Sequence, residues 1–410
     1  MKTFYGWRIV VAGGALQCLQ GLLLNQSFGV YLAVLVEDRG WSKTAVAGAA
    51  ALKSTEVAIL GPVLGWAVDR FGAQGIVRIG IITFGIGFML LSQIETLLGF
   101  YAAFVVVALG ASMFANSIVG VAIIQWFEKR RARALSALQF GSAVGGLFVF
   151  LVAASIQAYG WRTTAFASGV LAILIGWPLA RVIRSRPEDL GLHVDGEPPL
   201  PRDAAQAGPA AKPEFTVREA LATSAFWLIA LGHGFSLLVV SAVNVHAVAH
   251  IKEGLGYSLS LATLVFTLVT VGQFGGVMLG WMIGDRFVKR KVAAICMLMH
   301  CGGLLMITYA TGTVMLVTAA LIHGVAWGLR GPFMQAIRAD YFGRTSIGMI
   351  IGLSSMIIVI GQIGGPILAG LFADWTGNYR MGFTILAVLA GLGSLFFFVA
   401  RRPRRTDPVT

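Results

Sequence analysis

The chain has 410 residues, of which 57% are hydrophobic and 12% are charged, and its formal net charge is +13 at pH 7. Soluble domains carry about 25% charged residues, so much of this chain's surface is expected to face lipid. Its three cysteines, Cys18, Cys296 and Cys301, all fall in apolar runs, which argues against a disulfide framework or a CxxC metal site.

Short clusters of charge separate twelve apolar runs, each close to the roughly 20 residues needed to cross about 30 Å of hydrocarbon. The first run is too long for a signal-peptide core and lacks a clear small-residue cleavage site, so we expect it to be retained as the first span. The runs are 8–35, 45–68, 76–94, 97–125, 134–158, 163–183, 223–250, 258–283, 292–311, 313–337, 347–372 and 381–400.

The basic residues are unevenly distributed between these runs. If the N-terminus and alternate loops share one side of the membrane, that side holds most of the 31 Lys and Arg residues. This positive-inside asymmetry predicts a multi-pass protein of the cell (inner) membrane with both termini in the cytoplasm. The excess of Lys and Arg therefore indicates how the chain is oriented in the membrane, and no nucleic-acid partner is expected.

Residues 184–222 break the apolar pattern with six prolines among mixed charges. This composition predicts a cytoplasmic linker with a short helix near Val217–Ala220. The expected domains are a six-helix bundle over 1–184, a linker over 185–222, a second six-helix bundle over 223–400 and a cytoplasmic tail over 401–410. The predicted fold class is an all-α membrane protein of twelve transmembrane helices in two pseudo-symmetric bundles.

A repeat at one offset supports two halves of similar design. Adding 215 to Trp126 and Phe127 gives Tyr341 and Phe342, and the same offset carries Gly65–Trp66 onto Gly280–Trp281. In the eighth run, Gly272, Gly276 and Gly280 recur every four residues, which predicts a face for close helix packing.

Two ionisable side chains lie inside the second run. Glu56 is the only carboxylate expected within a span, and Lys53 precedes it by three residues on the same helical face. By helical rise Glu56 lies ~20 Å from Asp69, near the middle of the membrane. Because burying such a group is costly, it suggests a function. Two interpretations stay open: Glu56 and Lys53 take part in proton coupling, or they form a structural pair.

The tenth run contains Gly328-Leu329-Arg330-Gly331-Pro332. Arg330 lies ~15 Å from Asp340 by helical rise, which places it near the midplane. A guanidinium there needs an acceptor, and the neighbouring Gly and Pro loosen the helix as in transporter sites. Arg330 is expected either to contact a substrate anion or to make a fixed contact with Glu56 or backbone carbonyls. Arg338, two turns on, is expected to be structural and near the interface.

Polar residues within other spans are expected to line a polar cavity. For the first span, hydrogen bonding between helices is the alternative interpretation. His246 and His250 have a spacing that suits a metal, but no Glu or Cys joins them, so neither a metal nor another cofactor is expected. The expected lining residues are Gln20, Asn25, Gln26, Asn116, Asn244, His246 and Gln273.

The loop from Gly65 to Gly72, which contains Asp69-Arg70-Phe71, resembles the signature of the major facilitator superfamily, and Gly280–Lys291 is similar to a degenerate second copy. The resemblance covers nearly the whole chain and implies two six-helix halves. In that family the loop packs against the cytoplasmic ends of neighbouring helices and holds them together. The resemblance therefore implies gating roles for Asp69 and Arg70 and, in the second copy, for Asp285 and Arg286.

Tyr5-Gly6-Trp7 and the block from Trp126 to Gly145 resemble the monocarboxylate porter group, which includes proton-linked lactate and pyruvate carriers and is similar to oxalate–formate exchangers. Two departures matter. The coupling lysine of the lactate carriers corresponds to Gln26 here, and their eighth-span Asp and Arg correspond to Gly272 and Gly276. Lactate therefore does not follow as the substrate, and we expect an acid and a cation supplied from other helices, by Glu56 and Arg330.

These features predict a secondary active transporter that moves a small, monocarboxylate-like organic anion by alternating access, coupled to protons. The alternative is a proton-driven efflux carrier for an amphipathic or cationic compound, which a free central Arg330 would disfavour. A third class, a membrane sensor or assembly subunit, lacks support because no appended soluble domain is visible. No enzymatic activity is expected. The expected partners are the anion, protons and the lipid bilayer, and the protein is expected to be a monomer.

Overall fold

The structure is a computed structural model that describes residues 4–197 and 214–404. Several side chains between residues 43 and 54, that of Lys53 among them, also lie outside the described part. The chain divides into two compact units, Met1–Ala211 with Ile347–Gly352 and Lys212–Ser346 with Leu353–Thr410. The boundaries expected from the sequence, with a linker over 185–222, stay a prediction because they include residues 198–213, outside the described set.

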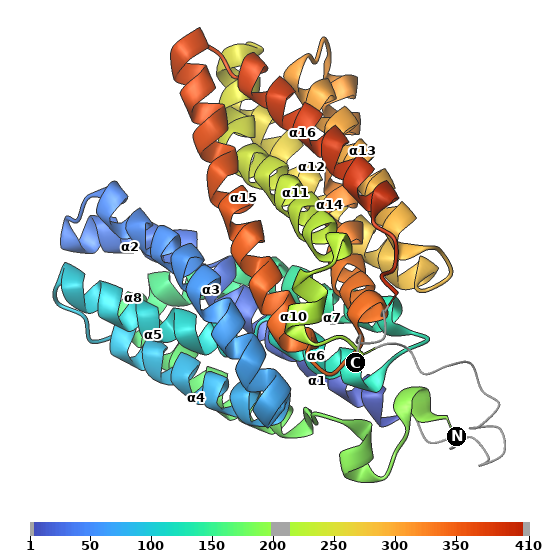
Figure 1. Cartoon of the computed structure of the whole chain (residues 1–410). Helices are drawn as coiled ribbons and strands as arrows, with labels where there is room; N and C mark the ends of the chain where they lie inside the picture. The colour runs from blue at the N-terminus through green and yellow to red at the C-terminus, as the bar shows by residue number, and fades with distance from the viewer. Residues whose placement is uncertain (1–3, 198–213, 405–410) are drawn as a thin grey trace. The chain divides into compact units, whose positions relative to one another are not determined.

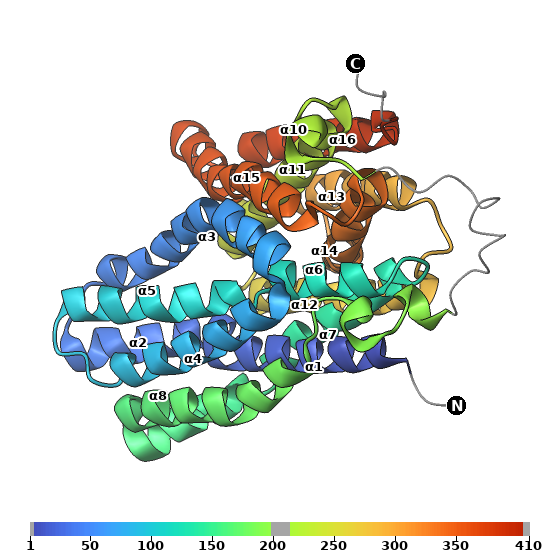
Figure 2. The same ribbon diagram turned by 60° about the horizontal axis from the view of Figure 1, so that its bottom comes forward.

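The first unit is built from long helices and a few short turns, coloured blue to green in Figure 1. The helix α4 packs against both α5 and α8, and Figure 2 shows α8 running alongside it. The elements are α1 (Tyr5–Gln20), the π-helical turn η1 (Gly21–Asn25), α2 (Phe28–Arg39), α3 (Lys43–Phe71), α4 (Ala73–Leu91), α5 (Leu97–Met113), α6 (Asn116–Trp126), α7 (Arg131–Leu147), α8 (Val149–Val182) and the 3-10 turns η2 (Pro187–Leu190) and η3 (Val194–Gly196).

The second unit begins with the short helix α10, which confirms the helix predicted near residues 217–220. Its long helices follow in yellow to red in Figure 1. The elements are α10 (Val217–Leu221), α11 (Ser224–Ala249), the π-helical turn η4 (His250–Gly254), α12 (Leu259–Ile283), α13 (Lys289–Thr308), α14 (Thr313–Phe342), α15 (Ile347–Thr376) and α16 (Arg380–Val399). The first residues of α15, Ile347–Gly352, group with the first unit.

The twelve predicted spans are confirmed within the described residues. Ten helical segments are long and apolar enough to cross a membrane. One of them, Arg131–Val182, contains two spans that meet at Gly160, whose φ of 78° only glycine adopts without strain. The 29-residue α3 supplies the remaining span.

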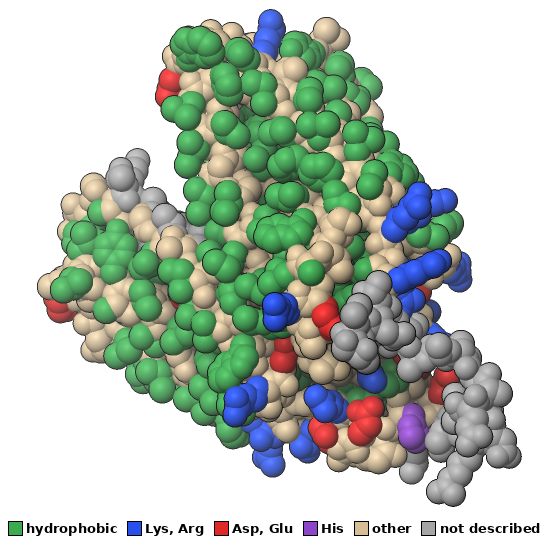
Figure 3. Space-filling view, viewed as in Figure 1, with side chains coloured by type: hydrophobic (Ala, Val, Ile, Leu, Met, Phe, Trp, Pro, Cys, Tyr) green, Lys and Arg blue, Asp and Glu red, His purple; other side chains and the backbone are tan. Residues whose placement is uncertain are grey.

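Large apolar side chains cover the outside of these helices. Leu98, Val314 and Trp375 are 80%, 81% and 76% exposed. On the face shown in Figure 3, hydrophobic side chains cover most of the helical surface and charged side chains gather in clusters. A surface of this kind is expected where lipid replaces water as the solvent.

Glycines bring neighbouring helix backbones into contact in each unit. In the first unit, a Cβ atom at Gly141 of α7 would overlap the carbonyl oxygen of Gly14 on α1. In the second unit, a Cβ atom at Gly276 of α12 would overlap the carbonyl of Val325, and one at Gly328 of α14 would overlap that of Gln273. The close-packing face predicted around Gly272 and Gly276 therefore exists, and its partner is α14.

The repeat in the sequence has a structural counterpart. Trp126 ends α6, and its Nε1 donates to the carbonyl of Arg184, 2.9 Å away. At the equivalent position near the end of α14, the hydroxyl of Tyr341 donates to the carbonyl of Ala400, also 2.9 Å away. Each aromatic side chain thus fastens the end of one helix to the segment just after the last long helix of its own unit.

Candidate functional site

Arg330 of the second unit is a buried charged side chain whose guanidinium has donor atoms without acceptors in the described part of the chain. It lies in the middle of α14 and is 1% exposed. Its Nε and Nη1 atoms have no hydrogen-bond acceptor among the residues that the structure describes. A guanidinium only donates hydrogen bonds and keeps its charge, so burying it without an acceptor is costly. Its surroundings therefore favour the binding of an anion or of water.

Arg338, on the same helix, has acceptors for its guanidinium. Its Nε donates to the Ser354 hydroxyl at 3.2 Å, its Nη1 to the Met334 carbonyl at 3.0 Å and its Nη2 to Nδ1 of His233 at 3.3 Å. These bonds support the structural role expected for Arg338. Partners on α11 and α15 bury it to 2% exposure, and its expected place near the membrane interface stays a prediction.

A pair of histidines lies in the same region. His300 on α13 and His323 on α14 are fully buried, and their Nδ1 atoms are 3.2 Å apart. Neither Nε2 atom has a partner within the described part of the chain. Arg330 is close enough for its charge to act on both rings. The sequence analysis missed this pair, although a histidine inside an apolar run such as 292–311 or 313–337 was a usable signal.

In the first unit, the polar residues of the first span divide into two groups. Gln20 is buried, and its Nε2 donates to the Ala111 carbonyl at 3.0 Å, as Gln17 does to Phe114 at 2.6 Å. These bonds between helices are the alternative interpretation given for this span. The residues Asn25 and Gln26 are exposed around η1, and Asn116 is half-buried at the start of α6. Substrate contacts by Gln20, Asn25, Gln26 and Asn116 stay predictions.

In the second unit, the predicted lining residues lie on α11 and α12. Asn244 is exposed, and Gln273 is half-buried. The His246 Nε2 atom lies 3.0 Å from the Pro366 carbonyl of α15, and its ring packs against that of Tyr379 at a tilt of 35°, with centroids 5.0 Å apart. His246 is thus held in place by its own unit, and a role in substrate contact stays a prediction for all three residues.

Glu56 and Lys53 belong to α3 of the first unit. Glu56 is half-buried, whereas the side chain of Lys53 lies outside the described residues. Arg330 belongs to the second unit. The proposed pairing of Glu56 with Lys53 or with Arg330, and its role in proton coupling, therefore stay predictions.

The signature loop at the end of α3 has a defined geometry. Both carboxylate oxygens of Asp69 accept backbone hydrogen bonds, from Gly348 and Met349 at 2.8 Å each, and these residues group with the first unit. Burial raises the pKa of Asp69 to about 6, and the two hydrogen bonds oppose that rise. The guanidinium of Arg70 lies over the rings of Trp66 and Phe71, 5.5 and 5.7 Å from their centroids.

The second copy of the loop is arranged differently. The Lys289 ammonium lies 2.9 Å from Asp285 and 2.8 Å from Asp340, and Arg286 is exposed. Asp285 therefore contributes to an ion-pair cluster at the start of α13. Gating roles for Asp69, Arg70, Asp285 and Arg286 stay predictions.

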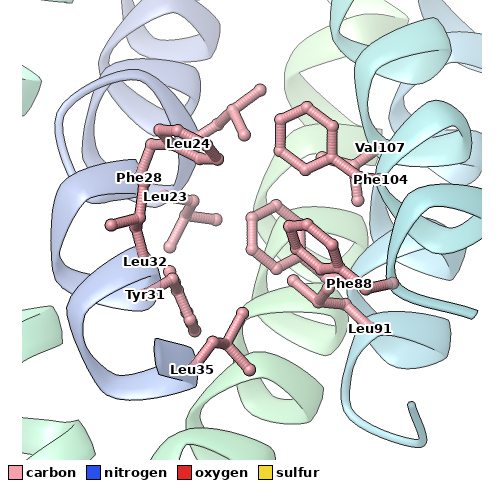
Figure 4. A pocket seen from close by; sticks show the side chains of 11 residues that line it. Leu23, Leu24, Phe28, Tyr31, Leu32, Leu35, Phe88, Leu91, Phe104 and Val107 are labelled. Carbon is pink, nitrogen blue, oxygen red and sulfur yellow. The ribbon is translucent and has the colours of Figure 1, made fainter. Parts of the chain in front are cut away.

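A pocket in the first unit has a different character. Figure 4 shows its lining of leucine, valine and aromatic side chains, and Tyr31 carries the only polar side-chain atom among the lining residues. Since no charged side chain lines it, this pocket offers no anchor for a carboxylate. The lining residues are Leu23, Leu24, Phe28, Tyr31, Leu32, Leu35, Phe88, Leu91, Phe100, Phe104 and Val107.

The fold and these buried charges define a helical membrane transporter class, and comparison with known proteins identifies the family. The family model of the Major Facilitator Superfamily matches residues 18–282 and 229–410. The chain belongs to that superfamily, as the sequence resemblance predicted, and is a multi-pass membrane protein of a transporter family.

Three curated relatives show the range of similarity. The chain is 25% identical to membrane sensor protein UhpC of Salmonella typhimurium, over 82% of this chain and 79% of the relative. It is 25% identical to human monocarboxylate transporter 11, covering 96% and 82% of the two chains. It is 26% identical to the 4-hydroxybenzoate transporter PcaK of Pseudomonas putida, covering 95% and 91%.

Solved structures agree on the fold. A double-tryptophan mutant of XylE superposes with a TM-score of 0.77 at 15% identity, covering 98% of this chain and 97% of that chain. The Escherichia coli fucose:proton symporter FucP superposes with a TM-score of 0.71 at 14% identity, covering 96% and 98%. These similarities establish the twelve-helix architecture. The substrate has to be inferred from the residues of the site.

Proposed function

We propose that this protein is a secondary active transporter that moves a small, monocarboxylate-like organic anion by alternating access, coupled to protons. The observation that carries the proposal is the buried guanidinium of Arg330, whose Nε and Nη1 lack acceptors in the described structure. A carboxylate can accept paired hydrogen bonds from one edge of a guanidinium, which are stronger than bonds between neutral groups. Binding of an organic anion would therefore relieve the cost of burying this charge.

The relatives support an anionic cargo. Two of them are named for monocarboxylate and 4-hydroxybenzoate transport, and both match this chain along most of its length. We assign Arg330 as the anchor and Gln20, Asn25, Gln26, Asn116, Asn244, His246 and Gln273 as candidate lining residues. Glu56 with Lys53 is a candidate for proton coupling. We further propose a monomer in the inner membrane with both termini in the cytoplasm.

A second candidate function is ligand sensing without net transport, because UhpC is named a membrane sensor protein. In that case Arg330 would still bind an anion, and no flux would follow. Efflux of a cationic compound is the less favoured transport mode, since a buried cation without an acceptor repels a positively charged cargo.

Uptake into proteoliposomes under an imposed pH gradient tests these functions. The labelled probes are pyruvate, oxalate, 4-hydroxybenzoate and one organic cation, with protein-free liposomes to correct for passive permeation. Arg330→Gln is compared with Arg401→Gln, which removes an exposed arginine that follows α16 in the same unit. Carboxylate flux that requires Arg330 but not Arg401 supports the proposal. Binding without flux favours a sensor, and cation flux, or carboxylate flux independent of Arg330, contradicts the assigned anchor.

A further inference from the structure

We propose that His300 and His323 form a proton-binding site of this transporter, which takes up a proton when an anion binds at Arg330. The inference rests on the proposed function, because it needs an anion at Arg330. It goes further by assigning the coupled proton to a histidine pair in the second unit. The sequence had suggested Glu56 on α3 for that role.

The geometry of the pair defines where the proton would bind. Two Nδ1 atoms 3.2 Å apart can share a hydrogen bond only if one ring carries its hydrogen on Nδ1 and the other presents a lone pair there. The donor ring then has an unprotonated Nε2, and the acceptor ring carries its hydrogen on Nε2. Neither Nε2 has a partner in the described structure. The Nε2 lone pair of the donor ring is therefore available to accept a proton. Protonation there leaves the hydrogen bond between the two Nδ1 atoms intact.

The charged and titratable groups around this pair are mostly cations. Arg330 lies on α14, and Cys296 precedes His300 by one turn on α13. From α11, His233 faces the same region and accepts a hydrogen bond from Arg338. The neighbouring α12 contains no titratable residue, and α16 contains only Arg380 at its start.

No carboxylate of the second unit lies near the middle of these helices. In the sequences of α11 to α16, the acidic residues Asp340 and Asp374 stand at helix ends, and no other Asp or Glu occurs in those helices. Without an anion, a protonated histidine pair would add a second positive charge beside Arg330. A bound carboxylate cancels one of those charges and so favours protonation.

This arrangement couples the two ligands in both directions. If the anion increases the affinity of the pair for a proton, then the proton increases the affinity for the anion by the same factor. The anion and proton would bind together on the acidic side of the membrane and leave together on the other side. The structure thus supplies a site for symport within one unit, and it does not require the Glu56 carboxylate.

The first test separates gradient-driven accumulation from exchange. Proteoliposomes contain wild type, His300→Asn or His323→Asn, and the probes are labelled pyruvate, oxalate and 4-hydroxybenzoate. With one proton per anion, a gradient of one pH unit drives about tenfold accumulation by wild type. Both variants are expected to lose accumulation. At equal pH and saturating anion they should retain counterflow within about threefold, because exchange requires no net proton release and saturation offsets the weaker anion binding of a site that lacks the proton. His250→Gln is the control. His250 is equally buried and its Nδ1 also lacks a partner in the described structure, but its Nε2 bonds to the Thr308 carbonyl and it takes no part in the histidine pair.

The second test uses the wild-type protein, so it does not depend on variants that fold. The chain has six histidines, which makes nitrogen-15 histidine spectra tractable. At a fixed, mildly acidic pH, addition of a transported probe is expected to shift the nitrogen signals of His300 and His323 toward the protonated form. The His250 signals should not change.

The outcomes distinguish the two proposals. If wild type neither binds nor moves any of the anions, the proposed function fails and this inference fails with it. If wild type transports an anion while both variants accumulate it normally, or while neither histidine becomes protonated, the proposed function stands and the histidine site is wrong. If Glu56→Gln loses accumulation while both histidine variants keep it, the coupled proton binds at Glu56 in the first unit and the histidine site is wrong.

Discussion

Arg330 and Arg338 lie two turns apart on α14. In the described structure each guanidinium nitrogen of Arg338 has a hydrogen-bond acceptor, whereas Nε and Nη1 of Arg330 have none. The acceptors of Arg338 are a hydroxyl, a carbonyl and an imidazole. Two buried charges on one helix can therefore be compared directly. We interpret Arg338 as a residue that stabilises the fold and Arg330 as one kept for a ligand.

Substitution of the two arginines should separate stability from transport. Arg338→Gln is expected to destabilise the protein by about 3 kcal/mol, because it leaves buried partners of its guanidinium without a donor. Arg330→Gln is expected to change stability by less than about 1 kcal/mol or to raise it, since it removes an uncompensated buried charge. It should lower kcat/KM for carboxylate uptake by more than about thirtyfold, equivalent to about 2 kcal/mol. Thermal unfolding in detergent and uptake assays measure both effects.

Arg330→Lys extends this comparison. A lysine keeps the charge but replaces the planar donor pair with a single ammonium, so it should restore little of the uptake. Full activity of Arg330→Lys would show that charge alone suffices, and loss of folded protein in Arg330→Gln would contradict the ligand role.

Substitution of the glycines between α12 and α14 should be costly at some positions and harmless at others. Gly328→Ala places a Cβ atom against the Gln273 backbone, and overpacking of this kind costs about 1–3 kcal/mol or more. Gly275→Ala is the matched control on α12, because nothing lies within 4 Å of the added atom. We expect a lower unfolding temperature and less folded protein for Gly328→Ala alone. Equal behaviour of both variants would mean that the helices separate easily.

Two carboxylates from the segment between the two halves, Asp195 and Glu214, accept hydrogen bonds from loops that occupy equivalent positions in the two units. In the first unit, Asp195 accepts from the backbone N–H groups of Glu128 and Lys129 at 3.2 and 2.9 Å. In the second unit, Glu214 accepts from those of Arg344 and Thr345 at 2.8 Å each. The sequence offset of 215 relates Lys129 to Arg344, so the two loops are held in the same way.

Neutralising either carboxylate should destabilise its own unit. Asp195→Asn and Glu214→Gln each weaken two charge-assisted bonds to backbone donors, for an expected loss of about 1–2 kcal/mol. Asn is chosen because it tolerates the positive φ of 59° at residue 195. The control is Glu197→Gln, which breaks only an exposed ion pair with Lys129 and should change nothing measurable. Thermal unfolding of all three variants tests this, and a similar loss in Glu197→Gln would count against it.

The pH dependence of stability should carry a signature of Asp69. Burial raises its pKa from 3.8 to about 6 in the folded protein, so the folded state binds this proton more tightly than the unfolded state. Its contribution to stability is therefore fully present below about pH 4 and is lost as the pH rises through about 6. The unfolding temperature of wild type minus that of Asp69→Asn should fall between about pH 4 and 7. A difference that stays constant, or that rises, would be inconsistent with a raised pKa.

The sequence predicted most of the fold, because hydrocarbon thickness and helical hydrogen bonding restrict a membrane chain to a few solutions. The twelve runs, the break near Gly160 and the glycine face of α12 all follow from local composition. The place of Arg330 within its helix follows in the same way, from its distance to Asp340, whereas the direction of its side chain does not.

The site was predicted less completely, since it depends on pairs of residues on different helices. The contact of His300 with His323 depends on the rotation of α13 against α14, which residue spacing does not determine. The same holds for Gln20, whose partner is a backbone carbonyl of α5, and for Arg338, which finds His233 on α11. Such contacts become visible only when helix faces are known.

The backbone contacts between α12 and α14 have a mechanical consequence. Where the two helices meet at Gly276 and Gly328, their main chains are in direct contact, so these segments resist sliding or rotating past each other. We therefore expect α12 and α14 to move together. Any force that a bound anion exerts on Arg330 would be transmitted to α12 as well, so that the conformational change involves a helix that contains no charge of its own.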